Sequence, residues 1–447
     1  MRIAEISVRK LFGIFDHTVP MNLGERITII HGPNGFGKTT ILRMVNSLFN
    51  GRFAELRKIP FDSFQVTFDN KMALKVIRRE PRGGGAAALD ISLLEGKEVV
   101  QVGSLKGVSP AQLDFPLSFI ESTVPFLSRE SETVWRDTRT REDLSLEDVF
   151  RSFPEYFPSP VVQKFGADSE LGWLAEVRKN VKVRFIESQR LLRLGKPRNP
   201  HEDEEAVRPS VVVYSKELAT RIKAKLAEYG TLSQSLDRSF PKRLVEQRSG
   251  RSSQGPSSTE LPLKLHELED RRIQLTEAGL LDKEDEKFDL SAYLEDPVLT
   301  DTVLPVYVQD TEQKLDVFTE IARKIDALKS IINARFLYKV MSIHKERGFV
   351  FRTSKGQPLS PSHLSSGEQH MLVLLYELLF TVQPNSLILI DEPEISLHVA
   401  WQLEFLSDLQ KITELASIDV LIATHAPGII NDRWDVSVEL KAPMEGK

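Results

Sequence analysis

The chain has 447 residues, of which 41% are hydrophobic and 28% charged, proportions typical of a globular protein. A chain of this length can bury at least one large core, and one to three domains are expected. Its formal net charge of −5 at pH 7 argues against a generally basic nucleic-acid coat. The sequence contains no cysteine, which excludes disulfides, thiolate metal sites and cysteine nucleophiles and favours the cytoplasm as its compartment.

The N-terminal part of the chain predicts strands around one glycine-rich loop. Residues 2–9 alternate apolar and polar from the start, without the apolar core of a signal peptide, and predict a strand. The run ERITIIH (25–31) is typical of a central strand buried on both faces, and TTILRMVNSLFN (39–50) predicts a helix. An antiparallel sheet is predicted from five period-2 segments, namely SFQVTFD, MALKVIRRE, LDISLLEG, KEVVQV and LSFIEST.

The middle of the chain predicts helices. From about residue 215, apolar residues recur at spacings of three and four, namely Leu218, Ile222, Leu226, Tyr229, Leu232, Leu236 and Phe240. A second helix is predicted over LHELEDRRIQL, and a third carries Leu315, Phe318, Ile321, Ile325, Leu328, Ile332 and Phe336. The longest arm should hold about 25–30 residues, or roughly 40 Å, far less than the coiled coil of a chromosome clamp. The apolar run MLVLLYELLFTV is interrupted by Glu377 and is too short for a membrane span, so no membrane is expected as a partner.

The C-terminal part returns to an α/β pattern. A hairpin is predicted from KVMSIH and FVFRTS around ERG, and two buried strands from SLILIDEPE (386–394) and DVLIATH (419–425), with a helix between them. We therefore predict an α/β core split between both ends of the chain. The expected segments are an N-terminal lobe at 1–190, a helical insertion at 191–335 and a C-terminal lobe at 336–447.

The segment GPNGFGKT (32–39) fits the phosphate-loop pattern G-x-x-x-x-G-K-[ST], and it follows a predicted strand and precedes a helix. Glycines let backbone N–H groups converge on phosphate oxygens, the lysine reaches the β- and γ-phosphates, and the Thr39 hydroxyl ligates Mg²⁺. The alternative, a chance glycine-rich turn, is disfavoured by this context. We predict ATP and Mg²⁺ as cofactors, with the nucleotide held by Gly32, Pro33, Asn34, Gly35, Phe36, Gly37, Lys38, Thr39 and Thr40.

Polar side chains at the ends of three other predicted strands complete a candidate catalytic set. In LILIDEPE (387–394), Asp391 suits the surroundings of Mg²⁺, and Glu392 suits a general base that takes a proton from the attacking water. His425, in THAP, is placed to reach a γ-phosphate, and Gln189 is placed to hold the Mg²⁺ or the lytic water. The alternatives are a solvated acidic pair, a structural histidine and a surface glutamine.

A second anion site is predicted at LSSGEQ (364–369), which precedes a long apolar helix. Ser365, Ser366 and Gly367 present hydroxyls, N–H groups and the positive helix end, and we assign Glu368 to the same site. The chain already has one phosphate loop. A second one is redundant unless it serves a different nucleotide.

The chain carries four motifs in the order GPNGFGKT, LSSGEQ, LILIDEPE and THAP. This set resembles the ABC-type ATPase heads of the SMC, Rad50, RecF and OLD-like group, over residues 1–50 and 335–440. The resemblance implies an α/β, ABC-type P-loop NTPase head with an antiparallel β subdomain and a short helical, coiled-coil-like insertion. It makes LSSGEQ the signature motif, which in that group closes on the γ-phosphate bound by the partner subunit. The implied partner is therefore a second copy of the chain, in a head-to-tail dimer or a higher homo-oligomer.

Two functional hypotheses follow from this resemblance, whereas the long segment between Lys38 and the signature disfavours a transporter ATPase. In the first, the chain is the regulatory ATPase of a bacterial antiviral system and controls a separately encoded effector nuclease. The segments FIESQRLLR and NDRWDVSVEL are similar to the ATPase subunits of PARIS systems, and Septu and retron-associated ATPases come next. The PARIS resemblance implies a TOPRIM-type toxin nuclease, released when a phage protein triggers the assembly, and no nuclease domain is expected after His425.

In the second hypothesis, the chain is a RecF- or Rad50-like repair ATPase that clamps DNA. The basic clusters RLLRLGKPR (190–198) and KRLVEQRSGR (242–251) are the only ones suited to this role. The overall charge gives no indication of DNA as a partner, and the predicted arm is short. Both features favour the first hypothesis.

Overall fold

The structure is a computed structural model of the chain, which forms two compact units. One unit comprises Met1–Arg208 and Thr381–Lys447, and the other comprises Pro209–Phe380. The sequence-based division into three segments stays a prediction, and here the residues of 336–380 belong with the helical unit. The described residues are 1–80, 87–107, 113, 115–131, 134–138, 143–165, 171–186, 192–194, 207–248, 260–282 and 299–442.

The first unit contains a five-stranded sheet in the order β11-β17-β18-β3-β19, with every neighbouring pair parallel. Its central strands are aliphatic and buried along nearly their whole length, as expected for a sheet covered on both faces. Helix α1 (Lys38–Asn50) follows β3 and packs against this sheet. The strands are β3 (Ile27–His31), β11 (Val183–Ile186), β17 (Leu387–Asp391), β18 (Asp419–Ala423) and β19 (Ser437–Glu439).

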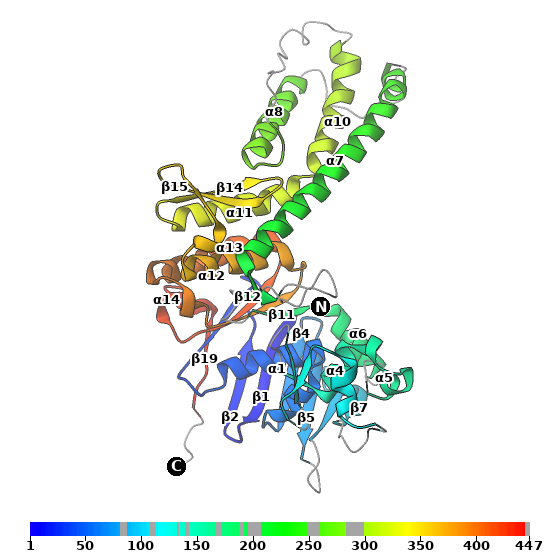
Figure 1. The fold of residues 1–447 in the computed structure, drawn as a ribbon, viewed down its shortest axis with the longest axis vertical. Coiled ribbons are helices and arrows are strands. Elements are labelled where there is room, and N and C mark those ends of the chain that lie inside the picture. The colour runs from blue at the N-terminus through cyan, green and yellow to red at the C-terminus, as the bar shows by residue number, and fades with distance from the viewer. Residues whose placement is uncertain are drawn as a thin grey trace. The chain divides into compact units, whose positions relative to one another are not determined.

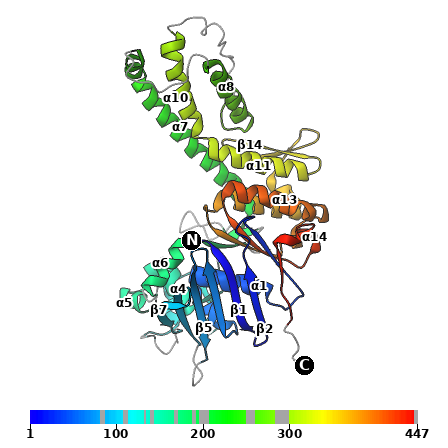
Figure 2. The same ribbon diagram turned by 180° about the vertical axis from the view of Figure 1, so that it is seen from behind.

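The same unit contains a six-stranded antiparallel sheet in the order β2-β1-β4-β5-β6-β7. Strands β1 and β2 lie side by side at one edge (Figure 2). Burial alternates along β4 and β6, so the period-2 pattern marks one face that packs into the core and one that does not. The strands are β1 (Ile3–Leu11), β2 (Phe15–Pro20), β4 (Ser63–Phe68), β5 (Met72–Arg79), β6 (Ala88–Glu95) and β7 (Glu98–Leu105).

The segment LSFIEST was predicted as a strand, and this prediction is wrong, because Ser118–Thr123 forms helix α3. Ile120 and Val124 are both fully buried, and their spacing of four residues is that of a helix. The remaining elements before the second unit are α2 (Phe53–Lys58), β8 (Leu127–Arg129), β9 (Val134–Asp137), β10 (Asp143–Ser145), α4 (Leu146–Ser152), α5 (Ser159–Phe165), α6 (Gly172–Asn180), β12 (Leu192–Leu194) and β13 (Val207–Pro209).

The second unit contains the predicted helical insertion, in which α7, α8 and α10 lie side by side (Figures 1 and 2). Helix α7 has 39 residues, ~58 Å at 1.5 Å per residue, so the arm is longer than the sequence periodicity predicted. The third predicted helix is divided after Asp316, where the Phe318 amide bonds the Leu315 carbonyl, a tighter turn than in an α-helix. The helices are α7 (Ser210–Arg248), α8 (Leu261–Glu277), α10 (Leu304–Asp316) and α11 (Thr319–Arg335).

A three-stranded antiparallel sheet and the signature helix complete the second unit. The sheet is formed by β14 (Lys339–His344), β15 (Gly348–Thr353) and β16 (Pro358–Leu359), so the predicted hairpin is present. The predicted apolar helix is present as α12 (Ser366–Tyr376), and it begins inside LSSGEQ, at Ser366. In the first unit, α13 (Val399–Ala416) and α14 (Pro427–Ile430) follow β17 and β18. The predicted fold class is confirmed as a mixed α/β fold with a parallel sheet, an antiparallel sheet and a helical insertion.

No helix among the described residues is long and apolar enough to cross a lipid bilayer.

Candidate nucleotide-binding site

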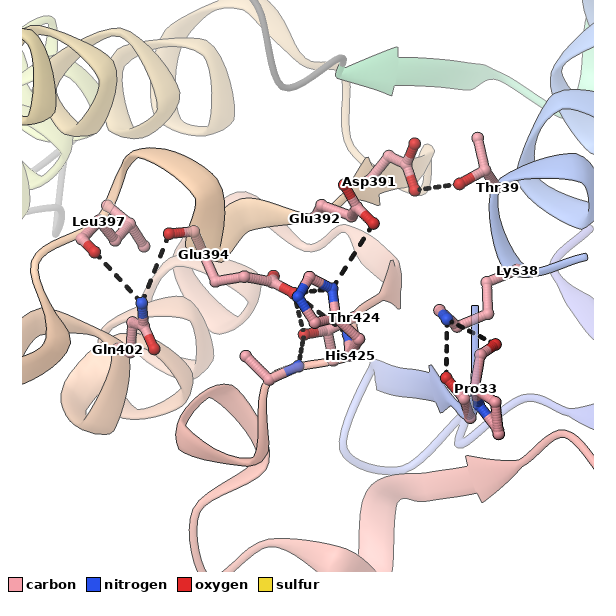
Figure 3. Close-up of polar contacts among 12 residues, drawn as sticks. Pro33, Lys38, Thr39, Asp391, Glu392, Glu394, Leu397, Gln402, Thr424 and His425 are labelled. Atoms are coloured by element: carbon pink, nitrogen blue, oxygen red, sulfur yellow. Dashed lines mark hydrogen bonds and ion pairs between the residues drawn. The ribbon is translucent and has the colours of Figure 1, made fainter. Parts of the chain in front are cut away.

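The candidate site lies at the carboxyl ends of three neighbouring parallel strands, β3, β18 and β17 (Figure 3). Backbone bonds continue the strand pairing past the strand ends: the Glu392 amide donates to the Ala423 carbonyl at 2.8 Å, and the Thr424 amide donates to the Ile30 carbonyl at 3.1 Å. Three motifs far apart in the sequence are therefore held at one edge of the sheet. Ligands of α/β proteins bind at such an edge.

The phosphate loop is folded around its own lysine. The Lys38 ammonium is buried and donates to the carbonyls of Gly32 at 2.7 Å and Pro33 at 3.1 Å. Gly37 has a φ of +89°, and a Cβ atom there would lie 2.5 Å from a Leu11 methyl carbon, so only glycine fits. The Lys38 ammonium can exchange these carbonyl partners for other oxygen atoms, and it lies at the N-terminus of a 13-residue helix. It is therefore suited to bind a phosphate group.

The loop is joined to the acidic end of β17 by one hydrogen bond. The Thr39 hydroxyl donates to a carboxylate oxygen of Asp391 at 2.9 Å. Burial raises the pKa of the Asp391 carboxyl, the Thr39 bond opposes this, and the charges of Glu392 and Glu394 raise the pKa further. A hydroxyl and a carboxylate side by side are the oxygen ligands that Mg²⁺ prefers, and a cation there would offset the crowded negative charge. These two residues therefore fit the predicted Mg²⁺.

Glu392 and His425 face one another at the same edge. The Glu392 carboxylate lies 3.5 Å from Nδ1 of His425, and its side chain is 31% exposed, which leaves it accessible to water. Glu392 also has a φ of 45°, in the left-handed region. A residue other than glycine occupies this region at some cost in free energy, and such residues cluster at functional sites.

Glu394 was not among the predicted site residues, yet its carboxylate lies closer to Nδ1 of His425 than that of Glu392 does. One of its carboxylate oxygens lies 3.1 Å from Nδ1 of His425, and the Thr424 hydroxyl donates to the same oxygen at 2.7 Å (Figure 3). The side chain is almost fully buried. The short helical turn Pro393–Ser396 brings Glu394 back toward β18, and the only sequence signal was a third acidic residue in DEPE.

His17, also absent from the prediction, supports the phosphate loop from β2. Its Nε2 atom lies 2.9 Å from the Phe36 carbonyl, and its ring stacks on Phe15, which also contacts the Phe36 ring. Burial lowers the pKa of His17, so the ring is neutral at pH 7. Among the other predicted loop residues, Pro33, Asn34 and Gly35 are exposed, and Thr40 lies on α1. Gln189 lies outside the described residues.

The signature residues belong to the second unit, where Ser365 caps the N-terminus of α12. The Glu368 carboxylate accepts from the Ser365 amide at 2.8 Å and hydroxyl at 2.9 Å, and it accepts from Lys339 at 2.6 and 2.7 Å. Burial raises the pKa of Glu368, but the bonds from Lys339 and Ser365 outweigh it and hold the pKa below its usual value. Glu368 therefore shapes the loop, and Ser366 and Gly367 occupy the first turn of the helix, where N–H groups are free for an anion.

A phosphate loop at the end of a parallel strand, bonded through its threonine to the acidic end of a second strand of the sheet, is the arrangement of a P-loop ATPase. The chain belongs to the family described as "AAA domain, putative AbiEii toxin, Type IV TA system", whose model matches residues 111–431, more than half of the chain. A second model, described as "AAA domain", matches residues 10–145. No curated protein matches the chain.

Solved SMC head domains are similar to the chain only at low TM-scores. The SMC head domain from Pyrococcus furiosus, bound to the C-terminal domain of ScpA, has 12% identity and a TM-score of 0.36, covering 99% of this chain and 94% of that one. The SMC head domain from Thermotoga maritima has 10% identity and a TM-score of 0.31, with 98% and 92% covered. A further SMC head, bound to the winged-helix domain of ScpA, has 10% identity and a TM-score of 0.33, with 96% and 92% covered. Similarities this low add nothing to the family assignment.

Proposed function

We propose that the chain binds Mg²⁺–ATP at the phosphate loop and hydrolyses it. The observation that carries this proposal is the 2.9 Å bond from Thr39 to Asp391, one residue before the accessible carboxylate of Glu392. Bound Mg²⁺ would neutralise charge that develops on the phosphates. Lys38 exchanges its loop carbonyls for phosphate oxygens, Glu392 takes a proton from the attacking water, and His425 contributes a polar contact on the same side.

We further propose that LSSGEQ serves the ATP bound by a second copy of the chain, in a head-to-tail dimer. Support comes from two separate candidate anion sites in one chain, one at the phosphate loop before α1 and one at the start of α12. The capping box between Ser365 and Glu368 fixes the backbone of the second site. The chain's own nucleotide is already served by the phosphate loop. The second, preorganised site is therefore suited to the nucleotide bound by a neighbouring copy.

This arrangement is tested by mixing two inactive variants. A Ser365→Arg chain should bind ATP at its intact phosphate loop but fail to hydrolyse it, because a bulky cation blocks closure on the partner's nucleotide. A Lys38→Ala chain has the complementary defect. Mixed at a fixed total concentration, they should regain activity that peaks at intermediate ratios, since each heterodimer assembles about one complete site. If subunit exchange is demonstrated and activity stays at zero at every ratio, the proposed site between two chains is excluded.

In the cell, we propose that this ATPase is the cytoplasmic regulatory subunit of a bacterial antiviral system and controls a separately encoded effector nuclease. Support comes from the family description, which names a toxin of a Type IV TA system, and from the resemblance of FIESQRLLR and NDRWDVSVEL to the ATPase subunits of PARIS systems. The PARIS resemblance makes the effector a TOPRIM-type toxin and the trigger a phage protein. The net charge of −5 gives no support to the alternative, a repair ATPase that clamps DNA.

The regulatory role predicts that the purified chain leaves DNA and RNA intact, even with ATP and Mg²⁺. The measurement is an electrophoretic cleavage assay on plasmid DNA and total RNA, with the Lys38→Ala chain prepared in parallel. Cleavage that follows the protein through purification, and that the Lys38→Ala chain lacks, would contradict the role. ATP hydrolysis that duplex DNA strongly stimulates, in a salt-dependent manner, would favour the repair alternative.

A further inference from the structure

We propose that Glu394 is a positioning residue for ATP hydrolysis, which holds His425 in one orientation and one tautomer. This inference rests on the proposed ATPase function. It gives a role to Glu394, which the sequence motifs did not single out and whose carboxylate bonds Thr424 and His425 rather than the phosphate loop.

One oxygen of the Glu394 carboxylate collects three contacts from two consecutive residues. It accepts hydrogen bonds from the Thr424 hydroxyl at 2.7 Å and from the His425 amide at 3.1 Å, and it lies 3.1 Å from Nδ1 of His425. The Thr424 hydroxyl in turn accepts from the Ala426 amide at 3.0 Å. The backbone and the ring of His425 are therefore held by the same carboxylate (Figure 3).

The second oxygen of the Glu394 carboxylate indicates that this side chain has more than a structural role. It is buried and has no hydrogen-bond partner among the residues that the structure describes. A buried carboxylate is costly, and leaving one of its oxygens unpaired adds to the cost. A glutamine could accept the bond from Thr424 equally well without burying a charge. A carboxyl group in this place, where an amide would fit, therefore points to a role toward the neighbouring ring rather than in stability alone.

The contacts at Nδ1 decide which ring nitrogen of His425 is available. Nδ1 faces two carboxylates, Glu394 at 3.1 Å and Glu392 at 3.5 Å, and an ionised carboxylate only accepts hydrogen bonds. Nδ1 therefore carries a proton, and Nε2 remains for a ligand at the edge of the sheet. The side chain of His425 is 47% exposed, so this nitrogen is reachable. Nε2 can donate to a phosphate oxygen only when it also takes up a proton from solvent, and the Glu394 carboxylate beside Nδ1 favours this doubly protonated ring, as a carboxylate does in a catalytic triad.

The turn that carries Glu394 is itself anchored. The Gln402 side-chain amide, on α13, donates to the carbonyls of Leu397 at 3.2 Å and Glu394 at 3.4 Å. The carboxylate therefore extends from a braced turn to the end of β18. A fixed carboxylate beside an exposed ring can orient that ring, whereas a mobile one cannot.

The test is a double-mutant cycle in the full chain, measured as steady-state ATP hydrolysis together with ATP affinity. Glu394→Gln should lower kcat on the order of 10- to 100-fold, as for other groups that orient a histidine, and leave ATP affinity nearly unchanged. In a His425→Ala background the same substitution should have no further effect, because Glu394 acts through the ring. Glu414→Gln, the same chemical change at an exposed position of α13, serves as the matched control.

Three results would overturn the inference: a wild-type kcat for Glu394→Gln, an equal loss with and without His425, or a loss of ATP affinity. If Glu394→Gln does not fold, the cycle is run with Glu394→Asp, which keeps the charge but withdraws it from the ring. An intermediate loss of kcat that again needs His425 supports the role, and an unchanged or His425-independent rate rejects it. Failure of the ATPase proposal itself would be distinct, because the wild-type chain would then hydrolyse no ATP.

Discussion

A Lys38→Ala chain is expected to lose ATP binding, with an affinity lower by on the order of 10²-fold, the worth of a strong charge-assisted contact. Lys38 is the buried cation of the phosphate loop, and its present partners are two loop carbonyls. Phosphate oxygens would replace these carbonyls when ATP binds, and alanine offers no replacement charge. Titration of the purified variant with a fluorescent ATP analogue, monitored by anisotropy, measures the change directly.

The variant should still fold, because the loss is confined to the loop and the two carbonyls can turn to water. Far-UV circular dichroism and the midpoint of thermal unfolding check this. Lys58→Ala, at the exposed end of α2, is the matched control and should bind ATP as the wild type does. An unchanged ATP affinity in Lys38→Ala would reject the phosphate-loop assignment, whatever the hydrolysis rate.

The parts of the site that the sequence predicted are those with local signals. The loop GPNGFGKT is bounded by an apolar run and a helical pattern, and the structure has β3, the loop and α1 in these places. The aliphatic runs before Asp391 and His425 likewise predicted two buried strands. Their adjacency followed from the topology of parallel sheets, and the Thr39–Asp391 bond is the result.

The parts that the sequence did not predict depend on tertiary contacts. The contacts of Glu394 are with Thr424 and His425, which follow a different strand, β18. The short helical turn Pro393–Ser396 directs its carboxylate toward them. His17 looked like one polar residue of an alternating strand, and only the fold places it under the Phe36 carbonyl. Helix α3 was misassigned because a short apolar segment fits both periods, and the burial of Ile120 and Val124 decided between them.

The two glutamates of DEPE occupy different environments, and this difference separates their roles. The Glu392 side chain is 31% exposed, whereas that of Glu394 is 6% exposed and hydrogen-bonded to Thr424. A general base needs access to the water it deprotonates, and a positioning carboxylate needs a fixed place. The exposed glutamate therefore suits proton transfer, and the buried one suits orientation of His425.

This division leads to the second large effect, which is expected for Glu392→Gln. The amide matches the carboxylate in shape but cannot take a proton from water, so hydrolysis should slow on the order of 10²–10⁴-fold, the usual contribution of a positioned base. ATP binding should persist, because Lys38 and Thr39 are untouched. Single-turnover hydrolysis under excess protein measures the chemical step without interference from product release.

Because binding persists while hydrolysis stops, Glu392→Gln should also accumulate an ATP-bound dimer, visible by light scattering after size-exclusion chromatography with ATP and Mg²⁺. Glutamine has backbone preferences close to those of glutamate at a φ of 45°, so the turn should keep its conformation. Glu414→Gln again serves as the control for the chemical change alone. Wild-type hydrolysis by Glu392→Gln would transfer the role of general base to His425 or Gln189. Loss of ATP binding would instead mean that Glu392 shapes the nucleotide site. The separation of roles between Glu392, as general base, and Glu394, as positioning residue, would then be unsupported.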